Sequence, residues 1–526
     1  MDPGITIAAP RSNDHASDHV EPFPRRSSRV DLVILAGIVG LAFLVRLLPV
    51  LRGGGLFGLN DYDDGVYFGS AIALVHGVIP YRDFLLLHPP GVLYVLAPFA
   101  ALGNVVGDAT AFAVARLAFM LLGAVNAGLV TLIAGRSGRR AALSAGLLYA
   151  VWQVAANVER TTWLIAPQNT LLLLTLLVLF RPGPTGAAIV PGVRRSAIAG
   201  VLLGLSFGCQ LWNAVPLVVV LGWLVLVSRR QPGGWLRPAL AYVIGAAIAA
   251  AIVWLPFLLA AGSQMVRYVV FDQLGRTPLS GSKLERIRTL EGLSAVSSVG
   301  RAVPTVAVVG GFLAIAAAVA WAAWRRPAIR LWAALLAAQV AVLMVIPPFH
   351  HYAGWLAPAG ALAIGGTVET ILGHRRMAGR PSNVFGAVYA TGLALFFLAA
   401  LVYPVGTRFD AVKAEAALGN ARCVTADSPV LLIETGALRR DLEAGCPLML
   451  DPTGTSYDTD RGLPRKRPKQ PEYQRAMEAY YGGSDAALFM RLPGDAFSPE
   501  TWAAIRGRLP VTVELGAVTV LLPANP

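Results

Sequence analysis

Long runs of apolar residues, separated by short polar stretches, fill most of the chain up to residue 404. A helix that crosses the hydrocarbon core of a membrane needs about 20 such residues. Several runs are shorter than this, and only the tripeptide WNA (212–214) separates two of them. The pattern predicts a mainly α fold, a polytopic transmembrane helical bundle of about eleven spans. The runs lie near 31–51, 109–134, 141–157, 166–180, 196–212, 214–228, 238–261, 302–324, 331–346, 352–372 and 384–404.

The composition agrees with a membrane protein, because 56% of the 526 residues are hydrophobic, 14% are charged and the mean hydropathy is +0.60. The formal net charge of +14 comes from groups of two or three Arg between apolar runs. A nucleic-acid-binding protein would instead gather its basic residues in one stripe. The charge therefore reports on membrane topology, and we expect no nucleic-acid partner.

The positions of the Arg residues predict the orientation of the bundle. Short cytoplasmic loops of membrane proteins are enriched in Lys and Arg. Every second connection carries three Arg, whereas the turns between them, near 158–165, 213 and 347–351, carry one Arg together. We therefore expect a multi-pass protein of the plasma membrane, with a disordered cytoplasmic N-terminal tail over residues 1–30. The Arg-rich loops are 135–140, 181–195, 228–238, 324–330 and 373–380.

Three segments are then placed outside the membrane. Two are loops, 52–108 and 262–301, that belong to a membrane-embedded module over 31–404. The third, 405–526, has no further apolar run of spanning length and is predicted to be a small extracytoplasmic α/β domain. Within it, PVLLIETGALRRDLEAG (429–445) is typical of a strand followed by a helix, and VTVELGAVTVLLP (511–523) of one or two strands.

The three cysteines fit this assignment. Cys423 and Cys446 both lie in the outer segment, where a disulfide can persist, whereas Cys209 lies in a predicted span. A disulfide between Cys423 and Cys446 and a pair of separate buried thiols are both compatible with the sequence.

Acidic residues gather at the start of the first outer loop, in LNDYDDGVYF (59–68). Asp61, Asp63 and Asp64 would repel one another at a low-dielectric boundary, and such repulsion raises the pKa of at least one carboxyl. A carboxylate of this kind can serve as a general base. The alternative is a solvated loop in which acids are simply well hydrated.

The longer stretch YDDGVYFGSAIALVHGVIPYRDFLLLHPPG (62–91) resembles the first outer loop of polyprenyl-phosphate-sugar-dependent membrane glycosyltransferases of the GT-C superfamily. The resemblance is greatest to family 39, which contains protein O-mannosyltransferases and lipid A aminoarabinose transferases. In those proteins an acidic pair is followed by an amphipathic helix, a G-x-x-P-Y-R-D turn and a Pro-Pro step. Here the pair is Asp63 and Asp64, the turn runs from Gly77 to Asp83, and the step is 88–91.

The resemblance implies transfer of a hexosyl or pentosyl group, with inversion, from a polyprenyl-phosphate donor to a hydroxyl at the outer face of the membrane. The acceptor would be a cell-wall glycan, a lipid-linked glycan or a secreted protein. Asp63 matches the catalytic Asp of the family, Asp64 takes the position that orients the acceptor or the base, and Asp61 is a secondary acid. His88 stands where many relatives carry a phosphate-binding Lys or Gln, and it could bind phosphate by a hydrogen bond or when protonated.

A leaving phosphate requires positive charge, and the second outer loop carries it in VVFDQLGRTPLSGSKLERIRTL (269–290). Arg276, Lys283 and Arg286 are the candidate donor-phosphate ligands, with Arg276 preferred because it lies in a Gly-Arg-Thr-Pro turn. The alternative is an amphipathic helix whose basic residues lie on anionic headgroups.

The segment IPPFHHYAGWLAPAG (346–360) places His350, His351 and Tyr352 at an outer span boundary. By the resemblance these residues lie near the donor pocket, and the alternative is a structural His-Tyr pair at the membrane interface. Neighbouring His side chains point in different directions on a helix, so no metal ligand is assigned. No cofactor motif is present, and participation of a divalent cation stays open.

Two other classes of protein compete with a transferase. A transporter or lipid flippase without transferase activity also has many spans, but it usually carries related halves and charges in mid-span. A non-catalytic assembly partner with the same scaffold would be expected to lack the acids. The sequence therefore favours an enzyme that works at one membrane face.

Overall fold

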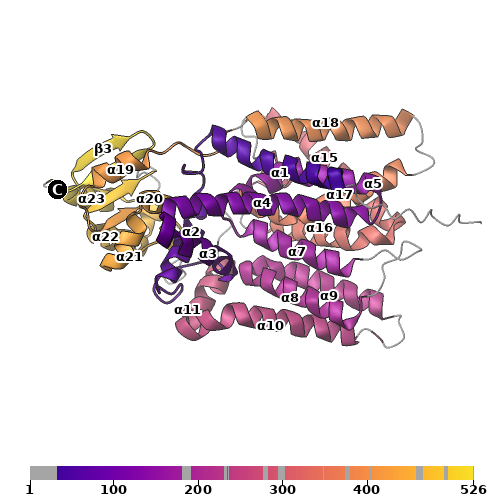
Figure 1. The fold of residues 1–526 in the computed structure, drawn as a ribbon, viewed down its shortest axis with the longest axis horizontal. Coiled ribbons are helices and arrows are strands. Elements are labelled where there is room, and N and C mark those ends of the chain that lie inside the picture. Colours follow the sequence, from indigo (N-terminus) through magenta and orange to yellow (C-terminus); the bar gives the residue numbers. More distant parts are fainter. Residues whose placement is uncertain are drawn as a thin grey trace, which may run out of the picture.

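The structure is a computed structural model. It describes residues 32–180, 191–229, 234, 236–276, 282–293, 302–346, 349–373, 380–402, 404–457, 466–490 and 496–524. The predicted tail 1–30 lies outside this part of the chain. The described residues form a long helical bundle with a small α/β unit at one end (Figure 1). We call residues 405–526 the C-terminal unit and the bundle end beside it the capped end.

The bundle consists of apolar helices at the positions that the sequence predicts. Seven described helices are long and apolar enough to cross a membrane, or eight if the pair bent by 49° near Trp152 is one span. The predicted spans 166–180, 196–212 and 331–346 are shorter helices of 15, 17 and 14 residues. All eleven predicted spans are therefore helical, and the chain is a multi-pass membrane protein. The spans are α1 (Leu32–Arg52), α4 (Asp108–Gly135), α5 (Arg139–Val151) with α6 (Gln153–Ala156) and η1 (Val158–Arg160), α7 (Ile165–Leu179), α8 (Val193–Cys209), η2 (Leu211–Asn213) with α9 (Ala214–Ser228), α10 (Leu236–Ala261), α15 (Thr305–Arg325), α16 (Arg330–Leu343), η6 (His350–Leu356) with α17 (Ala357–Leu372), and α18 (Arg380–Val402).

Two helices of the first long loop lie at the capped end, between the bundle and the C-terminal unit (Figure 1). They are α2 (Tyr62–Val75) and α3 (Gly91–Val106), and α2 is buried from Asp64 through Ala73. Gly65 lies so close to the C-terminal unit that a Cβ atom there would come within 2.6 Å of Val430. The first turn of α2 is therefore fixed by packing on both sides.

The C-terminal unit contains a four-stranded sheet in the order β1-β2-β4-β3, with β1 and β2 parallel and the other pairs antiparallel. The predicted strands in 511–523 are confirmed as the hairpin β3–β4, whose two-residue turn begins with Gly516 at φ 69°. The strand expected within 429–445 is wrong, because this segment forms two helices. Pro429 starts the first of them, where a helix tolerates the missing N–H. The elements are α19 (Ala411–Leu418), β1 (Val424–Ala426), α20 (Pro429–Glu434), α21 (Ala437–Ala444), α22 (Pro471–Gly482), β2 (Ala486–Phe489), α23 (Pro499–Arg508), β3 (Val511–Leu515) and β4 (Val518–Leu522).

A disulfide joins Cys423 and Cys446, which lie just before β1 and just after α21, with their Cα atoms 5.5 Å apart. Cys209 is a buried thiol in α8. The disulfide closes the first part of the C-terminal unit, the part that packs on α2.

A buried polar network ties the first span to the turn that follows α6. Arg46, fully buried in α1, donates to Glu159 at 2.5 and 3.1 Å. Glu159 also accepts from the hydroxyl of Tyr149 at 2.7 Å and from the amide of Asn126 at 3.0 Å. The network fixes the turn 158–164, which contacts the start of α2.

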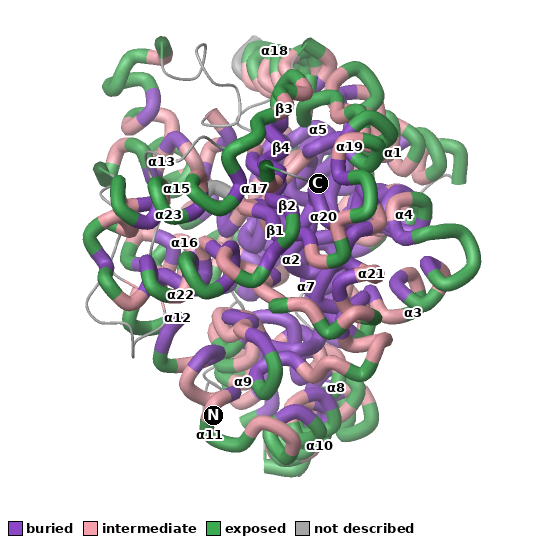
Figure 2. Tube along the Cα trace, turned by 90° about the vertical axis from the view of Figure 1, so that its left-hand side faces the viewer, coloured by how far each residue is buried: buried purple, intermediate pink, exposed green. Residues whose placement is uncertain are grey.

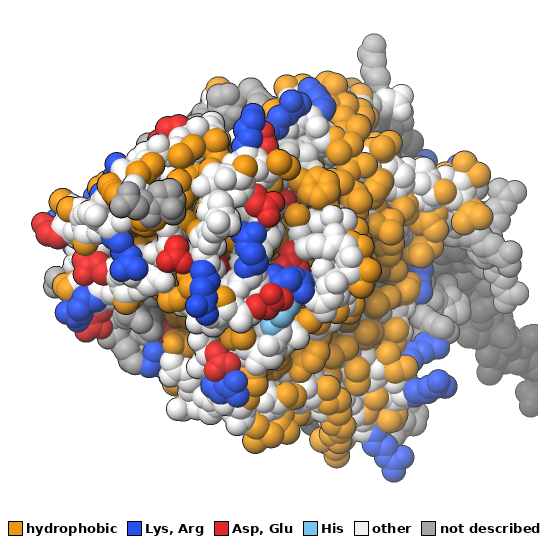
Figure 3. Space-filling model, turned by 60° about the vertical axis from the view of Figure 1, so that its left-hand side comes forward, with side chains coloured by type: hydrophobic (Ala, Val, Ile, Leu, Met, Phe, Trp, Pro, Cys, Tyr) orange, Lys and Arg blue, Asp and Glu red, His pale blue; other side chains and the backbone are white. Residues whose placement is uncertain are grey.

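The surface of the bundle differs from the surface of the C-terminal unit. Viewed toward the capped end, the C-terminal unit covers a densely buried centre (Figure 2). Hydrophobic side chains form a belt over the bundle, and charged side chains gather over the C-terminal unit (Figure 3). Such a belt is the surface expected of a protein embedded in lipid.

Candidate active site

The predicted acidic cluster lies at the N-terminus of α2. Asp61 is the N-cap residue, and its side chain accepts a hydrogen bond of 3.0 Å from the backbone N–H of Asp63. Negative side chains are favoured here because the helix dipole and the free N–H groups are positive at this end. Burial and the charge of Asp63 raise the pKa of Asp61. Among the three acids, the pKa of the N-cap residue Asp61 is thus raised by its neighbouring carboxylates as well as by burial.

Asp64 points into the protein. Its side chain is fully buried and forms an ion pair of 2.7 Å with Arg116 of α4. It also accepts hydrogen bonds of 2.7 Å from both the backbone N–H and the hydroxyl of Thr162. Arg116 in turn bonds Glu434 of α20 at 3.0 Å. Asp64 therefore joins α2, α4, the outer turn and the C-terminal unit.

Asp63 points the other way and is the accessible member of the pair, with 31% of its side chain exposed. Its Oδ2 atom lies 3.8 Å from Nδ1 of His351, which is 12% exposed. The His351 ring packs against Trp163 and Tyr352, with ring centroids 4.6 Å apart in both cases. The structure thus brings the first outer loop and the predicted donor-pocket segment together around one carboxylate.

Arg276 is the cation of the second outer loop that reaches this region. Its guanidinium lies over the rings of Phe349, at 5.6 Å, and of Tyr457, at 4.7 Å. Its Nε atom is buried and has no hydrogen-bond partner within the described part of the chain. Burial and the charge of Asp63 raise the pKa of Tyr67, and Arg276 opposes this shift, so both charges act on the same buried ring.

His88 packs against α2 and senses the charge of Arg276. Its ring contacts the edge of Tyr67 at 5.5 Å, and its backbone carbonyl accepts a 2.7 Å hydrogen bond from the hydroxyl of Tyr81. Gln273 holds the neighbouring carbonyl of Leu87 at 2.6 Å. Burial and the charge of Arg276 lower the pKa of His88 to about 3. His88 is therefore a neutral hydrogen-bonding group at physiological pH.

The other predicted phosphate ligands lie elsewhere. Lys283 is exposed at the start of α13 (Lys283–Glu291). Arg286 is buried and donates to the carbonyls of Leu343 and Ile346, at the C-terminal end of α16. The side chain of His350 lies outside the described residues. Of the three basic candidates, Arg276 is the one that the described structure brings to the acidic helix.

The C-terminal unit contributes residues that the sequence did not indicate. The hydroxyl of Tyr62 donates to Oδ1 of Asp451 at 2.8 Å, and the same hydroxyl accepts from the N–H of Thr453 at 2.9 Å. Asp451 also accepts from the N–H of Gly454 at 2.6 Å. Its segment reads DPTGTSY (451–457), a turn-forming composition that could have identified a loop but not its partners.

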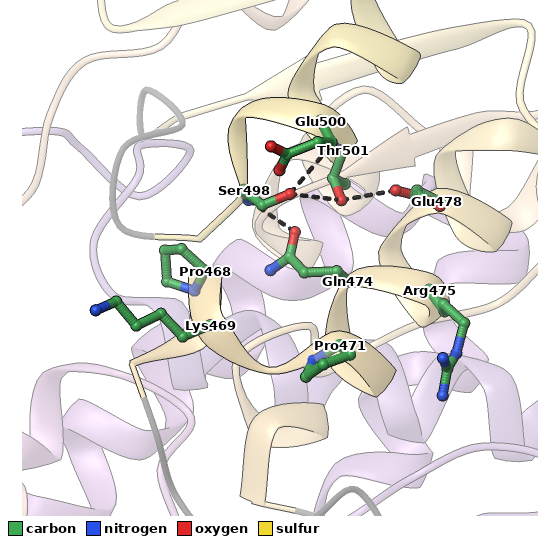
Figure 4. Close-up of a pocket in the computed structure, with 9 residues that line it drawn as sticks. All are labelled: Pro468, Lys469, Pro471, Gln474, Arg475, Glu478, Ser498, Glu500 and Thr501. Carbon is green, nitrogen blue, oxygen red and sulfur yellow. Dashed lines mark hydrogen bonds between the residues drawn. The ribbon is translucent and has the colours of Figure 1, made fainter.

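A polar hollow, of about 380 Å³, lies on the C-terminal unit between α22 and α23 (Figure 4). Thr501 donates to Glu478 at 2.7 Å, and the N–H of Ser498 donates to Gln474 at 2.8 Å. These side chains bond one another and hold α22 against α23. None of the predicted site residues lines this hollow.

The described residues contain no group of three or more His, Cys, Asp or Glu side chains that could hold a metal ion. The site offers a partly exposed carboxylate, a neighbouring imidazole and a guanidinium that lies over two aromatic rings. A carboxylate can accept a proton, and a guanidinium can bind an anionic oxygen.

The fold is that of GT-C membrane enzymes. ArnT from Cupriavidus metallidurans, in the apo state, aligns with a TM-score of 0.55 and 16% identity over 93% of this chain and 97% of that one. The arabinofuranosyltransferase AftD from Mycobacteria aligns with a TM-score of 0.51 and 14% identity, over 94% of this chain and 40% of AftD. The Archaeoglobus fulgidus oligosaccharyltransferase in the apo form aligns with a TM-score of 0.51 and 13% identity, over 89% of this chain and 70% of that one. ArnT has also been solved bound to undecaprenyl phosphate, where the TM-score is 0.50 at 16% identity over 93% and 97%.

A search of curated protein sequences finds no match. The model of glycosyltransferase family 87, by contrast, matches residues 86–348, which is half of the 526 residues. The expectation of a GT-C-type glycosyltransferase is thereby confirmed for the chain, and the family whose model matches is 87, over residues that begin at 86. The chain is a membrane glycosyltransferase, and it belongs to glycosyltransferase family 87.

Proposed function

We propose that the protein transfers a sugar from a polyprenyl-phosphate-linked donor to a hydroxyl acceptor, with Asp63 as the general base. One observation carries the proposal: Asp63 is the exposed acid of a paired cluster whose neighbour Asp64 is fully buried in an ion pair. Family membership supports a transferase over a transporter. The ArnT complex with undecaprenyl phosphate, a structure with the same fold, supports the donor class.

In the proposed reaction, Asp63 removes the proton of the acceptor hydroxyl while that oxygen attacks the anomeric carbon of the donor. The bond from this carbon to the phosphate oxygen breaks, and its electron pair leaves with the polyprenyl phosphate. Attack from the face opposite the leaving group inverts the anomeric centre. His351, 3.8 Å from Asp63, would orient the carboxylate toward the acceptor.

The leaving phosphate develops negative charge, and Arg276 is the cation that would stabilise it. Its guanidinium is held by Phe349 and Tyr457, while its Nε atom lacks a hydrogen-bond partner among the described residues. His88 would assist as a neutral hydrogen-bond donor, because burial and the charge of Arg276 lower its pKa to about 3.

The reaction would take place at the outer face of the plasma membrane, with the N-terminus in the cytoplasm and the C-terminal unit outside. The Arg-rich loops of the sequence support this orientation. The disulfide of the C-terminal unit supports it independently, because such bonds persist on the oxidising side of a membrane. The acceptor would be a cell-wall glycan, a lipid-linked glycan or a secreted protein.

The test is a transfer assay of the purified protein with a small panel of undecaprenyl- and decaprenyl-phosphate sugars. Asp63→Asn should lower kcat by roughly 100-fold or more, because a general base contributes about 10²–10⁴ in rate. Its melting temperature should stay at the wild-type value, since Asp63 is partly exposed. Asp83→Asn is the matched control, because Asp83 is an exposed acid of the same loop paired with Arg82.

Near-normal transfer by Asp63→Asn would refute the assignment of the base. The transporter alternative would replace the proposal if the wild-type protein moved lipid or solute across proteoliposome membranes but transferred no sugar.

A further inference from the structure

The C-terminal unit reaches into the site through one short turn, residues 451–457. Tyr457, at the end of this turn, places its ring 4.7 Å from the guanidinium of Arg276. Phe349, from the membrane module, lies 5.6 Å from the same guanidinium. The guanidinium of the proposed phosphate ligand thus contacts one ring from the bundle and one ring from the C-terminal unit. Such cation–π contacts orient a guanidinium through its flat face. Its N–H groups, which lie in the guanidinium plane, stay available for hydrogen bonds to phosphate.

Hydrogen bonds within the turn link the residues that precede Tyr457 to one another. Asp451 accepts from the N–H of Gly454 at 2.6 Å, and the hydroxyl of Ser456 donates to the carbonyl of Thr453 at 2.7 Å. Its last four residues, Gly454–Tyr457, form a short 3₁₀ helix. Tyr457 therefore has a fixed position relative to Asp451.

The same turn is bound to the helix of the proposed base. Tyr62 donates to Asp451 at 2.8 Å and accepts from the N–H of Thr453 at 2.9 Å. Tyr62 immediately precedes Asp63 in the chain. The charge of Arg276 also acts on Asp451, since it opposes the rise in the pKa of Asp451 that burial causes. One turn of the C-terminal unit thus contacts both the base helix and the cation.

We propose that Tyr457 is a positioning residue for the donor phosphate, because its ring holds the Arg276 guanidinium in the orientation that binds phosphate. The inference rests on the proposed function, in which Arg276 is the phosphate ligand. It gives the C-terminal unit a part in donor binding that acts through Arg276, because the unit supplies one of the two aromatic rings over that guanidinium.

The experiment measures binding of undecaprenyl phosphate to the full-length protein in detergent. Wild type is compared with the single variants Tyr457→Phe, Tyr457→Ala and Arg276→Ala, and with the double variant that combines Tyr457→Ala and Arg276→Ala. Loss of the aromatic ring should weaken binding roughly 3- to 20-fold, the range expected for a partly buried cation–π contact. Tyr457→Phe keeps the ring and should bind within about twofold of wild type. Arg475→Ala, an exposed cation of the same unit, is the control and should bind like wild type.

The double variant separates positioning from a general structural effect. If Tyr457 acts through Arg276, Tyr457→Ala should have no further effect once Arg276 is Ala. Equal weakening by Tyr457→Ala in both backgrounds, or wild-type binding by Tyr457→Ala alone, would overturn the inference. Wild-type binding by Arg276→Ala would overturn it too, and would also remove Arg276 from the proposed phosphate site. Loss of transfer in Asp63→Asn is independent of all these outcomes, so failure of the base assignment can be told apart from failure of this inference.

Discussion

Asp64 and Asp63 are neighbours in the sequence, yet the structure predicts opposite consequences when each is replaced. Asp64→Ala removes the 2.7 Å ion pair with Arg116 and both hydrogen bonds from Thr162, at a site with no solvent access. The guanidinium of Arg116 then stays buried. Its remaining acid is Glu434, at 3.0 Å, and burial raises the pKa of Glu434 to about 8. Glu434 alone then faces the buried guanidinium, and burial opposes its ionisation.

Removing one partner of a buried ion pair costs about 3–5 kcal/mol, because the other charge is left without compensation. We expect Asp64→Ala to lose free energy of unfolding in this range. Asp64→Asn should lose less, because its amide oxygen can still accept the bonds from Thr162. Asp63→Ala, at a side chain 31% exposed, should change stability by at most about 1 kcal/mol.

The measurement is thermal unfolding of the three variants and wild type in the same detergent, followed by intrinsic tryptophan fluorescence. Asp64→Ala should lower the melting midpoint by roughly 5 °C or more. Sugar transfer is measured on the same samples below the lowest midpoint. A variant Asp64→Ala that melts like wild type but transfers no sugar would refute the reasoning, and would make Asp64 rather than Asp63 the candidate base.

Two further predictions concern pH and redox state. Folding lowers the pKa of His88 from 6.5 to about 3, so the folded state resists protonation that the unfolded state accepts. This contribution to stability is complete above pH 6.5 and is lost as the pH falls toward 3, by up to about 1 kcal/mol per pH unit. The melting midpoint of His88→Gln should therefore fall less than that of wild type between pH 7 and pH 5, and equal slopes would contradict the burial of a neutral imidazole. The disulfide between Cys423 and Cys446 closes a loop with a sequence separation of 23, and replacing both residues by Ser should cost about 3 kcal/mol in the C-terminal unit. Under denaturing conditions, mass spectrometry should find one alkylated cysteine before reduction and three after it, and three before reduction would exclude the bond.

The sequence predicted those features that depend on local composition. Spanning helices need apolar runs of fixed length, so the helices at 109–134 and 238–261 could be located by counting residues. One or two strands were expected within 511–523 from its residue pattern, and the structure forms two that are joined at Gly516. The short apolar run at 429–433 was assigned to a strand, because a few buried apolar residues have the same pattern in a strand and in a buried helix.

The division of labour between Asp63 and Asp64 could not be predicted in the same way. Consecutive residues on an α-helix point about 100° apart, so Asp63 and Asp64 cannot both point in the same direction. Which one faces inward depends on the side of α2 that packs on α4 and α20, and that packing is set by Arg116 and by the close approach of Gly65 to Val430. These are contacts between distant parts of the chain, and no local pattern contains them.

The same reasoning explains why Tyr457 and Asp451 escaped prediction although they lie beside the acidic helix. Tyr62 and Asp451 are 389 positions apart, and their hydrogen bond exists because the C-terminal unit docks on the capped end. Residues of such a unit become part of the site only through docking, so their importance depends on the docked geometry rather than on their own sequence context. Helix α2, which carries Asp63, and the proposed phosphate ligand Arg276 therefore both contact the same turn of the C-terminal unit. A substitution that loosens the 451–457 turn should disturb the orientation of Arg276 even when Asp63 and its partner His351 are intact.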